Sequence, residues 1–257
     1  MPAQLDLTRL SVRQFAERFR SEMIPLSNTF SYFCASVPMT EDDLKEYLQE
    51  PVAALPPAMT AALPKISILL VPYLERGNGS RSKTPASDFV TVEKPPEGKM
   101  STSTQLRMGD ETVLAFALKD QEVAEYHYRF YHLLATLMGD HWSEGTEASY
   151  GRVLREELNA DAHGEVDEPS WRLKQTLRRV QVSRGGAVKN SKTFREYARQ
   201  SFIDTLTLYL HGICCDIDVD TGPRQLPSRY LRKRLMALEQ MFPPPIGYAV
   251  FPEQLEP

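Results

Sequence analysis

The chain has 257 residues, of which 42% are hydrophobic and 25% are charged, and its formal net charge at pH 7 is −4. These proportions are typical of a folded globular protein and exclude collagen, a disulfide scaffold and a wholly disordered chain. The length predicts a single domain over residues 1–257. Within it we expect a subdivision into a helical arm with a small sheet (1–118) and a helical bundle (119–257).

The three cysteines are Cys34, Cys214 and Cys215, an odd count that includes one adjacent pair. A disulfide between neighbours would be strained, so we expect reduced thiols in an intracellular, cytoplasmic protein. Charged residues interrupt the N-terminal segment where a signal peptide has its apolar stretch. The most apolar run, residues 66–74, is far shorter than the ~20 residues of a membrane-spanning helix. Secretion and membrane spanning are therefore not expected.

The N-terminal region predicts two helices. Ser11 and Gln14 form a capping-box pattern ahead of apolar residues at helical spacing, which predicts a helix over about 11–23. Thr40 precedes an acidic turn that suits the positive end of the helix dipole, and it caps a second, short helix. We expect Pro51 to end that helix.

The pattern changes to short, branched apolar segments between residues 65 and 118. Such segments predict buried strands, and Gly109-Asp110 lies between two of them as a tight hairpin turn. A small antiparallel sheet is the arrangement we expect. Its strands are predicted at residues 65–74, 89–92, 104–108 and 112–118.

From residue 120 onward the spacing is helical, and the predicted fold class is helix-dominated α+β. A sheet at about 65–118 packs with a C-terminal helical bundle at about 120–242. We expect Asp120 and Ser170 to cap two of the helices, Gly139 to end the first, and residues 246–251 to form a terminal strand. The helices are predicted at residues 120–138, 146–158, 171–182, 193–215 and 228–242.

Charge is concentrated in two neighbouring stretches. Residues 101–170 contain fourteen acidic and five basic residues, whereas residues 171–200 contain nine basic residues and one acidic residue. A Gly-Gly loop and polar donors precede the helix at 193, and a helix N-terminus suits an anion. Arginine and lysine also gain affinity for nucleic acid by releasing its counterions. We therefore predict that a phosphate-bearing partner (nucleic acid, a nucleotide or another phosphorylated ligand) binds Arg172, Lys174, Arg178, Arg179, Arg184, Lys189, Lys192 and Arg195.

Two alternatives stand beside that prediction. The basic residues can instead neutralise the acidic stretch 140–168 of the same chain, which is the commoner role of a charged run. No nucleic-acid-binding motif or phosphate loop accompanies them. The chain can also serve as a non-catalytic subunit or scaffold whose partners are other protein subunits.

A second candidate site lies at the end of the longest predicted helix. Asp204, His211 and Cys215 are spaced by seven and four residues, so they share one helical face. Imidazole, thiolate and carboxylate groups bind zinc or iron, which predicts a divalent metal and a metal-dependent hydrolase. The full predicted ligand set is Asp204, His211, Cys215, Asp216 and Asp218.

The histidines of the preceding long helix are further ligands if the two helices pack together. His127 and His132 are five residues apart, about 140° around a helix, so we do not expect them to act together. The sequence has no HExxH or CxxC motif to support the metal hypothesis. The alternative is that His211 is a hydrogen-bonded histidine at the edge of the core and that the cysteines fill space.

Overall fold

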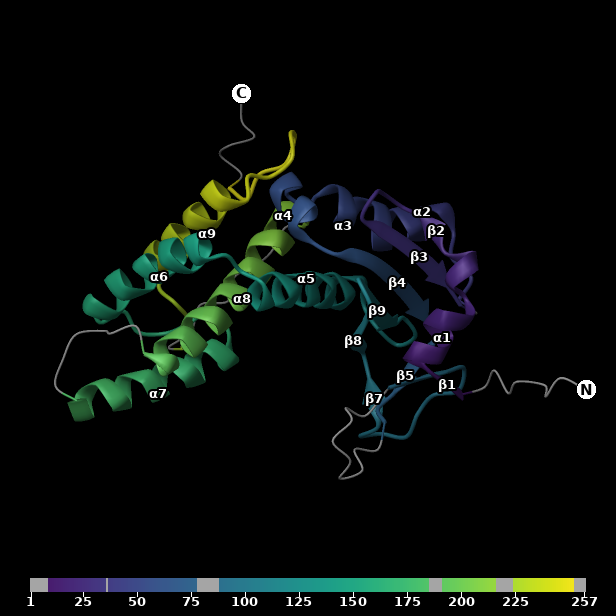
Figure 1. The fold of residues 1–257 in the computed structure, drawn as a ribbon, viewed down its shortest axis with the longest axis horizontal. Helices are drawn as coiled ribbons and strands as arrows, with labels where there is room; N and C mark the ends of the chain where they lie inside the picture. Colours follow the sequence, from purple (N-terminus) through teal and green to yellow (C-terminus); the bar gives the residue numbers. More distant parts are fainter. Residues whose placement is uncertain (1–8, 36, 78–87, 185–190, 216–223, 252–257) are drawn as a thin grey trace, which may run out of the picture. The chain divides into compact units, whose positions relative to one another are not determined.

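The computed structural model describes residues 9–35, 37–77, 88–184, 191–215 and 224–251, and of residues 180–184 it describes only the backbone (Figure 1). The fold is α+β with helices predominating, which confirms the predicted class. Contacts divide the chain into two compact units, residues 1–50 with 63–129 and residues 51–62 with 130–257. Helix α5 (Val123–Asp140) is unbroken, and its first turns belong to the first unit and its later turns to the second.

The predicted capping box at Ser11 and the predicted helix cap at Thr40 are both confirmed. At the start of α1 (Val12–Arg18), the Ser11 hydroxyl accepts the Gln14 N–H at 3.3 Å and the Gln14 side chain accepts the Ser11 N–H at 3.1 Å. Thr40 and Asp43 form the same box at the start of α2 (Glu41–Leu44). Helix α1 is shorter than predicted because a 3₁₀ turn, η1 (Arg20–Glu22), follows it.

The helix that begins at Thr40 does not end at Pro51, so that prediction is wrong. A π-helical turn, η2 (Lys45–Gln49), leads into α3 (Glu50–Ala53), and α4 (Pro57–Ala62) follows. Pro51 is the second residue of α3, which continues directly from η2, so the helix passes through a position that has no backbone N–H to donate. The Glu50 N–H donates to the carbonyl of Lys45, five residues earlier. In the same five-residue pattern, the donor to the Glu46 carbonyl would be the N–H of residue 51. Proline has no N–H, which leaves the Glu46 carbonyl oxygen for a partner outside the helix.

The strands form two sheets, one five-stranded in the order β2-β3-β4-β9-β8 and one four-stranded in the order β1-β6-β5-β7. The prediction of a single antiparallel sheet is wrong, because the predicted segments are divided between these two sheets. The four-stranded sheet is antiparallel, and so is the predicted β8–β9 hairpin, where Gly109 has φ of +67°. In addition, β4 pairs in parallel with both β3 and β9. The strands are β1 (Arg9–Ser11), β2 (Ile24–Pro25), β3 (Phe30–Cys34), β4 (Lys65–Val71), β5 (Tyr73–Glu75), β6 (Phe89–Thr91), β7 (Met100–Ser101), β8 (Ser103–Met108) and β9 (Glu111–Ala117).

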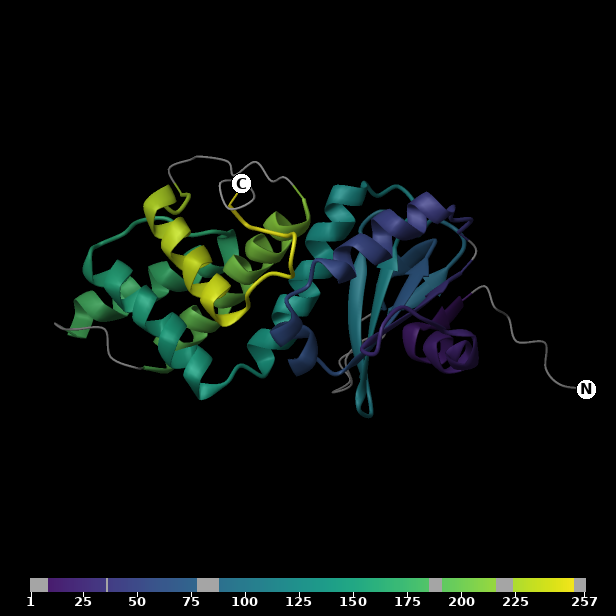
Figure 2. The same ribbon diagram turned by 90° about the horizontal axis from the view of Figure 1, so that it is seen from above.

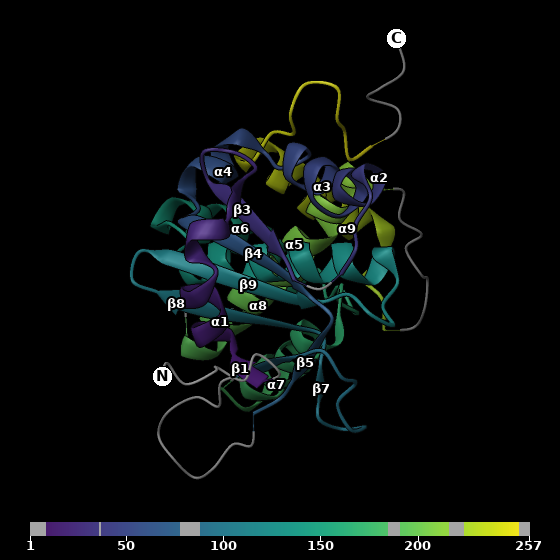
Figure 3. The same cartoon turned by 90° about the vertical axis from the view of Figure 1, so that its right-hand side faces the viewer.

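Side chains of successive residues in the central strands point to opposite faces of the five-stranded sheet. Leu69 and Val113 belong to the cluster that packs against Phe15 of α1, which lies across one face of the sheet (Figure 3). On the other face, the ring of Phe116 meets that of Tyr126 in the first turns of α5 at 5.0 Å. Both faces of the central strands are therefore buried.

The second unit is helical in the part of the chain that the structure describes (Figure 2). Helices α6 (Glu144–Asn159), α7 (Glu168–Arg184) and α9 (Ser228–Met241) all contact α8 (Lys192–Cys214). None of the described helices is long and apolar enough to cross a membrane. The predicted apolar face of α8 is buried throughout, at Phe194, Ala198, Phe202, Leu206, Leu210 and Ile213.

Several predicted helix and strand boundaries are wrong, two of them because the predicted capping side chain has another partner. Asp120 does not cap α5; it has φ of +60° and accepts a hydrogen bond from Lys94 at 2.6 Å. Ser170 lies inside the first turn of α7, where its hydroxyl donates to the Asp167 carbonyl at 3.0 Å. Gly139 lies within the last turn of α5, and residues 246–251 form no strand.

Candidate metal centre

His211 and Cys215 lie one turn apart where α8 ends. His211 is in the last turn, and the backbone N–H of Cys215 donates to its carbonyl at 2.8 Å as the C-cap of the helix. Both side chains are half-buried, and none of the three cysteines of the chain forms a disulfide. The four-residue spacing directs an imidazole and a thiol to the same side of the helix.

Helix α5 runs antiparallel beside this end of α8. The ring centroid of Tyr131 lies 6.1 Å from that of His211, and His132 Nδ1 lies 3.4 Å from the hydroxyl of Thr207. Residue numbers therefore increase along α5 in the direction in which they decrease along α8. His127 precedes Tyr131 by one turn on the same face.

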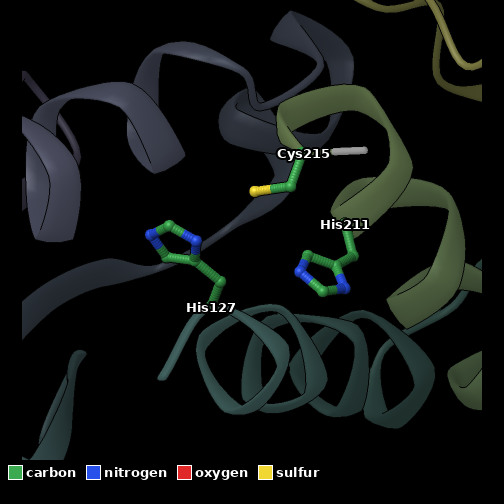
Figure 4. Close-up of side chains that lie close together, drawn as sticks. All are labelled: His127, His211 and Cys215. Carbon is green, nitrogen blue, oxygen red and sulfur yellow. The ribbon is translucent and has the colours of Figure 1, made fainter. Parts of the chain in front are cut away.

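One ligand atom from each of His127, His211 and Cys215 lies within 4.8 Å of the other two. Figure 4 shows the three side chains pointing toward one another from α5 and from the end of α8. Among the described residues, no other group of three or more His, Cys, Asp or Glu side chains has ligand atoms this close together. Two imidazoles and a thiolate can hold a transition metal ion.

The proton of His127 is placed by the backbone of η2. His127 is buried, and its Nε2 lies 2.9 Å from the Glu46 carbonyl oxygen, the acceptor that Pro51 leaves without an intrahelical donor. A carbonyl only accepts, so Nε2 must carry the hydrogen. In the neutral ring, Nδ1 then presents its lone pair, which is the arrangement that outer-shell carbonyls impose on metal-binding histidines.

Asp204, predicted as a ligand, has other partners. Its carboxylate accepts from the Ser170 backbone N–H at 3.2 Å and from the Gln200 amide at 2.7 Å, so it holds the start of α7 against α8. Burial raises the pKa of Asp204, and these hydrogen bonds act in the opposite direction. Asp216 and Asp218 lie outside the described residues.

Much of the predicted phosphate-binding stretch is paired within the chain. Lys174 is fully buried, 3.1 Å from Glu165 and 2.7 Å from the Gly164 carbonyl. Arg178 lies 2.9 Å from Asp161, and Arg172 lies 2.9 Å from Glu168. These carboxylates belong to the acidic stretch 140–168. Lys174, Arg178 and Arg172 are therefore paired with acidic residues of the same chain, as the alternative to phosphate binding predicts.

The other predicted phosphate-binding residues are more exposed or lie outside the described side chains. Lys192 is 86% exposed and 3.8 Å from Glu196 on its own helix. Arg179 and Arg195 are exposed on α7 and α8. The backbone of Arg184 ends α7, and Lys189 lies outside the described residues.

A buried charge cluster in the second unit was missed by the sequence analysis. Arg234 of α9 is fully buried and binds Glu157 at 2.6 Å and Glu165 at 2.6 Å, and its Nη1 donates to the Ser201 hydroxyl at 2.7 Å. Burial alone would raise the pKa of Glu165, but the charges of Arg234 and Lys174 outweigh it and hold that pKa at about 2. Arg234 lies in a run of basic residues (RYLRKR), which hides it among exposed neighbours. The local signal that could have found it is its spacing of three residues from Leu231 and four from Leu238, which places it on the buried face of α9.

No protein-family model matches the sequence, and no curated protein or solved structure matches it either.

Proposed function

We propose that the protein binds a divalent transition metal ion, zinc in the first place, through His127, His211 and Cys215. The observation that carries the proposal is the convergence of three ligand atoms within 4.8 Å of one another. Zn–N and Zn–S bonds of about 2.0–2.3 Å place ligand atoms at separations of this order around one ion. The side chains would need only small rotations to bind it.

The donor set favours zinc over magnesium or calcium. Those ions select oxygen ligands, whereas imidazole and thiolate suit zinc and its neighbours in the transition series. The hydrogen bond from His127 to Glu46 supports the proposal because it holds the ring in the tautomer that a metal needs. The reduced Cys215 that coordination requires also fits the intracellular location predicted from the cysteines.

Zinc titration of the full chain, stripped of metal and set against a chromophoric chelator, tests the proposal. We expect one zinc ion per chain, and Cys215→Ser, His211→Gln and His127→Gln should each weaken binding by at least about tenfold. We take tenfold as the lower limit because removal of an outer-shell partner of a metal ligand already weakens metal binding by about 10–100-fold. The matched controls, Cys214→Ser and His141→Gln, should bind as the wild type does.

Either of two results would overturn the proposal: a wild-type chain that binds no zinc, or a Cys215→Ser chain that binds it as tightly. The three residues would then be core residues, with His127 held by its hydrogen bond and the cysteine filling space.

A phosphate-bearing partner is our second proposal, now restricted to the start of α8. Ser191 caps this helix of 23 residues, and the exposed Lys192 and Arg195 lie in its first turn. Fluorescence anisotropy with a short oligonucleotide should show binding that falls steeply with salt and is weakened by the double substitution Lys192→Gln and Arg195→Gln. Lys119→Gln, an exposed lysine of the first unit, is the control. Absent or salt-independent binding would remove this proposal.

A further inference from the structure

We infer that a polar cavity in the first unit binds a small zwitterion, a molecule of amino-acid size with one ammonium group and one carboxylate group. The cavity has a volume of about 390 Å³, within the range of small-molecule sites. It lies where β3, β4 and β9 begin, and η1, β2 and the segments before β3 and β9 complete its wall. All of its lining residues are described and belong to one unit, so the site is independent of the proposed metal centre.

Polar side chains interrupt the apolar face of the five-stranded sheet at this end of the strands. Ser31, Ser67 and Glu111 each lie two residues before an apolar residue that packs on the α1 side of the sheet, so their side chains point to that same side. Ser67 is 1% exposed, and the side chain of Glu111 is 19% exposed. Polar groups so far removed from water require hydrogen-bond partners. The three apolar residues are Phe33, Leu69 and Val113.

The Glu111 carboxylate is held in position by its neighbours. Its Oε1 accepts a hydrogen bond from the Ser67 hydroxyl, and its Oε2 accepts one from Arg20 Nη2 at 2.6 Å. Because the Ser67 hydrogen is used in that bond, the Ser31 hydroxyl, 3.2 Å away, must be the donor to Ser67. Each carboxylate oxygen retains a second lone pair that can accept from a ligand. The cavity therefore contains an anion whose orientation is set before any ligand binds, which lowers the entropic cost of binding.

Charges of both signs line the cavity in equal number. Arg20 and Lys65 supply two cations, and Asp110 and Glu111 supply two anions. Arg20 pairs with Glu111, and the exposed Lys65 and Asp110 add one further charge of each sign. A simple anion would meet two carboxylates, and a simple cation would meet two basic groups, so the like charges disfavour both. A zwitterion avoids this repulsion when its carboxylate lies by Lys65 and its ammonium group lies by Asp110 and Glu111.

Nuclear magnetic resonance of the full, metal-free chain labelled with nitrogen-15 tests the inference, with 4-aminobutanoate as the probe. Butanoate and butylammonium are the matched control compounds, because each keeps one of the two charges of the probe. We expect 4-aminobutanoate to shift the backbone amide signals of Ser31, Lys65 and Glu111 saturably. Each control compound should bind at least about fivefold more weakly, because it loses one charge pair and leaves a like charge uncompensated.

Substitutions at the two exposed charges distinguish the two ends of the probe. Lys65→Gln should weaken the binding of 4-aminobutanoate and of butanoate by about threefold to fivefold, but not that of butylammonium. Asp110→Asn should weaken the binding of 4-aminobutanoate and of butylammonium to the same extent, but not that of butanoate. The control variants, Lys119→Gln and Glu97→Gln, change exposed residues outside the cavity and should bind all three compounds as the wild type does.

Three results would overturn the inference: no saturable shift at these amides, equal affinity for all three compounds, or binding that Lys65→Gln and Asp110→Asn leave unchanged. Each of these results would leave the metal proposal intact, because the chain is tested without metal.

Discussion

Arg234 and Glu165 meet as a two-pronged ion pair that no solvent reaches, with Nη1 2.6 Å from Oε2 and Nη2 2.9 Å from Oε1. Glu157 binds the same guanidinium, and Lys174 adds a second cation beside Glu165. Two positive and two negative charges thus balance inside the second unit. Such a cluster is most sensitive to the removal of a single member, because the remaining charges are left buried and unpaired.

The first prediction concerns Arg234 itself. Replacing it by methionine leaves Glu157 and Glu165 without their shared cation, which should lower the free energy of unfolding by about 3–5 kcal/mol. Lys233→Met changes the exposed neighbour on the same helix and should cost less than about 0.5 kcal/mol. Urea denaturation followed by circular dichroism measures both variants. Equal stabilities of the two variants would show that the cluster does not hold the helices together.

The second prediction concerns acid stability. The folded protein holds the pKa of Glu165 at about 2, below its ordinary value of 4.5. The ionised carboxylate therefore stabilises the fold above about pH 4.5, and this stabilisation is lost as the pH falls from there toward 2. Unfolding free energies measured between pH 2 and 6 should fall less steeply for Glu165→Gln than for the wild type. Glu168→Gln, which removes an exposed carboxylate, should keep the wild-type slope, and a wild-type slope in Glu165→Gln would contradict the prediction.

The third prediction concerns Gly164, which lies next to Glu165. Its φ is +75°, and a Cβ at this position would lie 2.0 Å from the Gln225 carbonyl oxygen, so Gly164→Ala must displace backbone. Gly98 has a similar φ of +86° with nothing within 4 Å of such a Cβ, so Gly98→Ala incurs only the conformational strain of about 1–2 kcal/mol. Gly164→Ala should cost at least about 1 kcal/mol more because of the overlap. Thermal unfolding compares the two, and equal losses would exclude a tight approach at Gly164.

The fourth prediction concerns metal and stability together. An ion that binds only the folded chain should raise its free energy of unfolding by about 2.7 kcal/mol when free zinc is 100 times the dissociation constant. A chelator should reverse the gain. Differential scanning calorimetry should show it in the wild type and in Cys214→Ser. Persistence of the full gain in Cys215→Ser would place the ion elsewhere.

The fifth prediction concerns Pro51 as a positioning residue. Pro51→Ala supplies an N–H that competes for the Glu46 carbonyl, so His127 is held less firmly and zinc affinity should fall by about tenfold. A nitrogen-15 shift of the His127 ring reports the changed hydrogen bond, which a loss of packing alone would not produce. Pro57→Ala, an exposed proline at the start of α4, is the control. Unchanged zinc affinity and ring shift in Pro51→Ala would refute this role.

Local patterns predicted the features that depend on neighbouring residues. The capping box at Ser11, the helix cap at Thr40, the turn at Gly109 and the buried face of α8 each follow from residues within a few turns of one another. Residues of β4 pair in parallel with residues of β3 that are 36 positions earlier in the chain and with residues of β9 that are 46 positions later. No local pattern encodes such pairings, so the sheet was predicted without them.

The candidate metal site was predictable in part for the same reason. The spacing of His211 and Cys215 placed them on one helical face, whereas Asp204 has a backbone partner on α7 that the spacing does not reveal. The choice of His127 rather than His132 depends on how α5 turns toward α8, and only contacts such as that of Tyr131 with His211 establish it. Sequence spacing supplied candidates, and packing selected among them.

The acceptor that orients His127 is a main-chain oxygen, which every amino acid carries. Replacing Glu46 by any residue that preserves η2 would leave the contact in place, so an alanine scan would report this position as dispensable. The imidazole is thus controlled by the path of the polypeptide rather than by the chemical identity of the residue it touches. A comparison of relatives by amino-acid identity alone would overlook it as well.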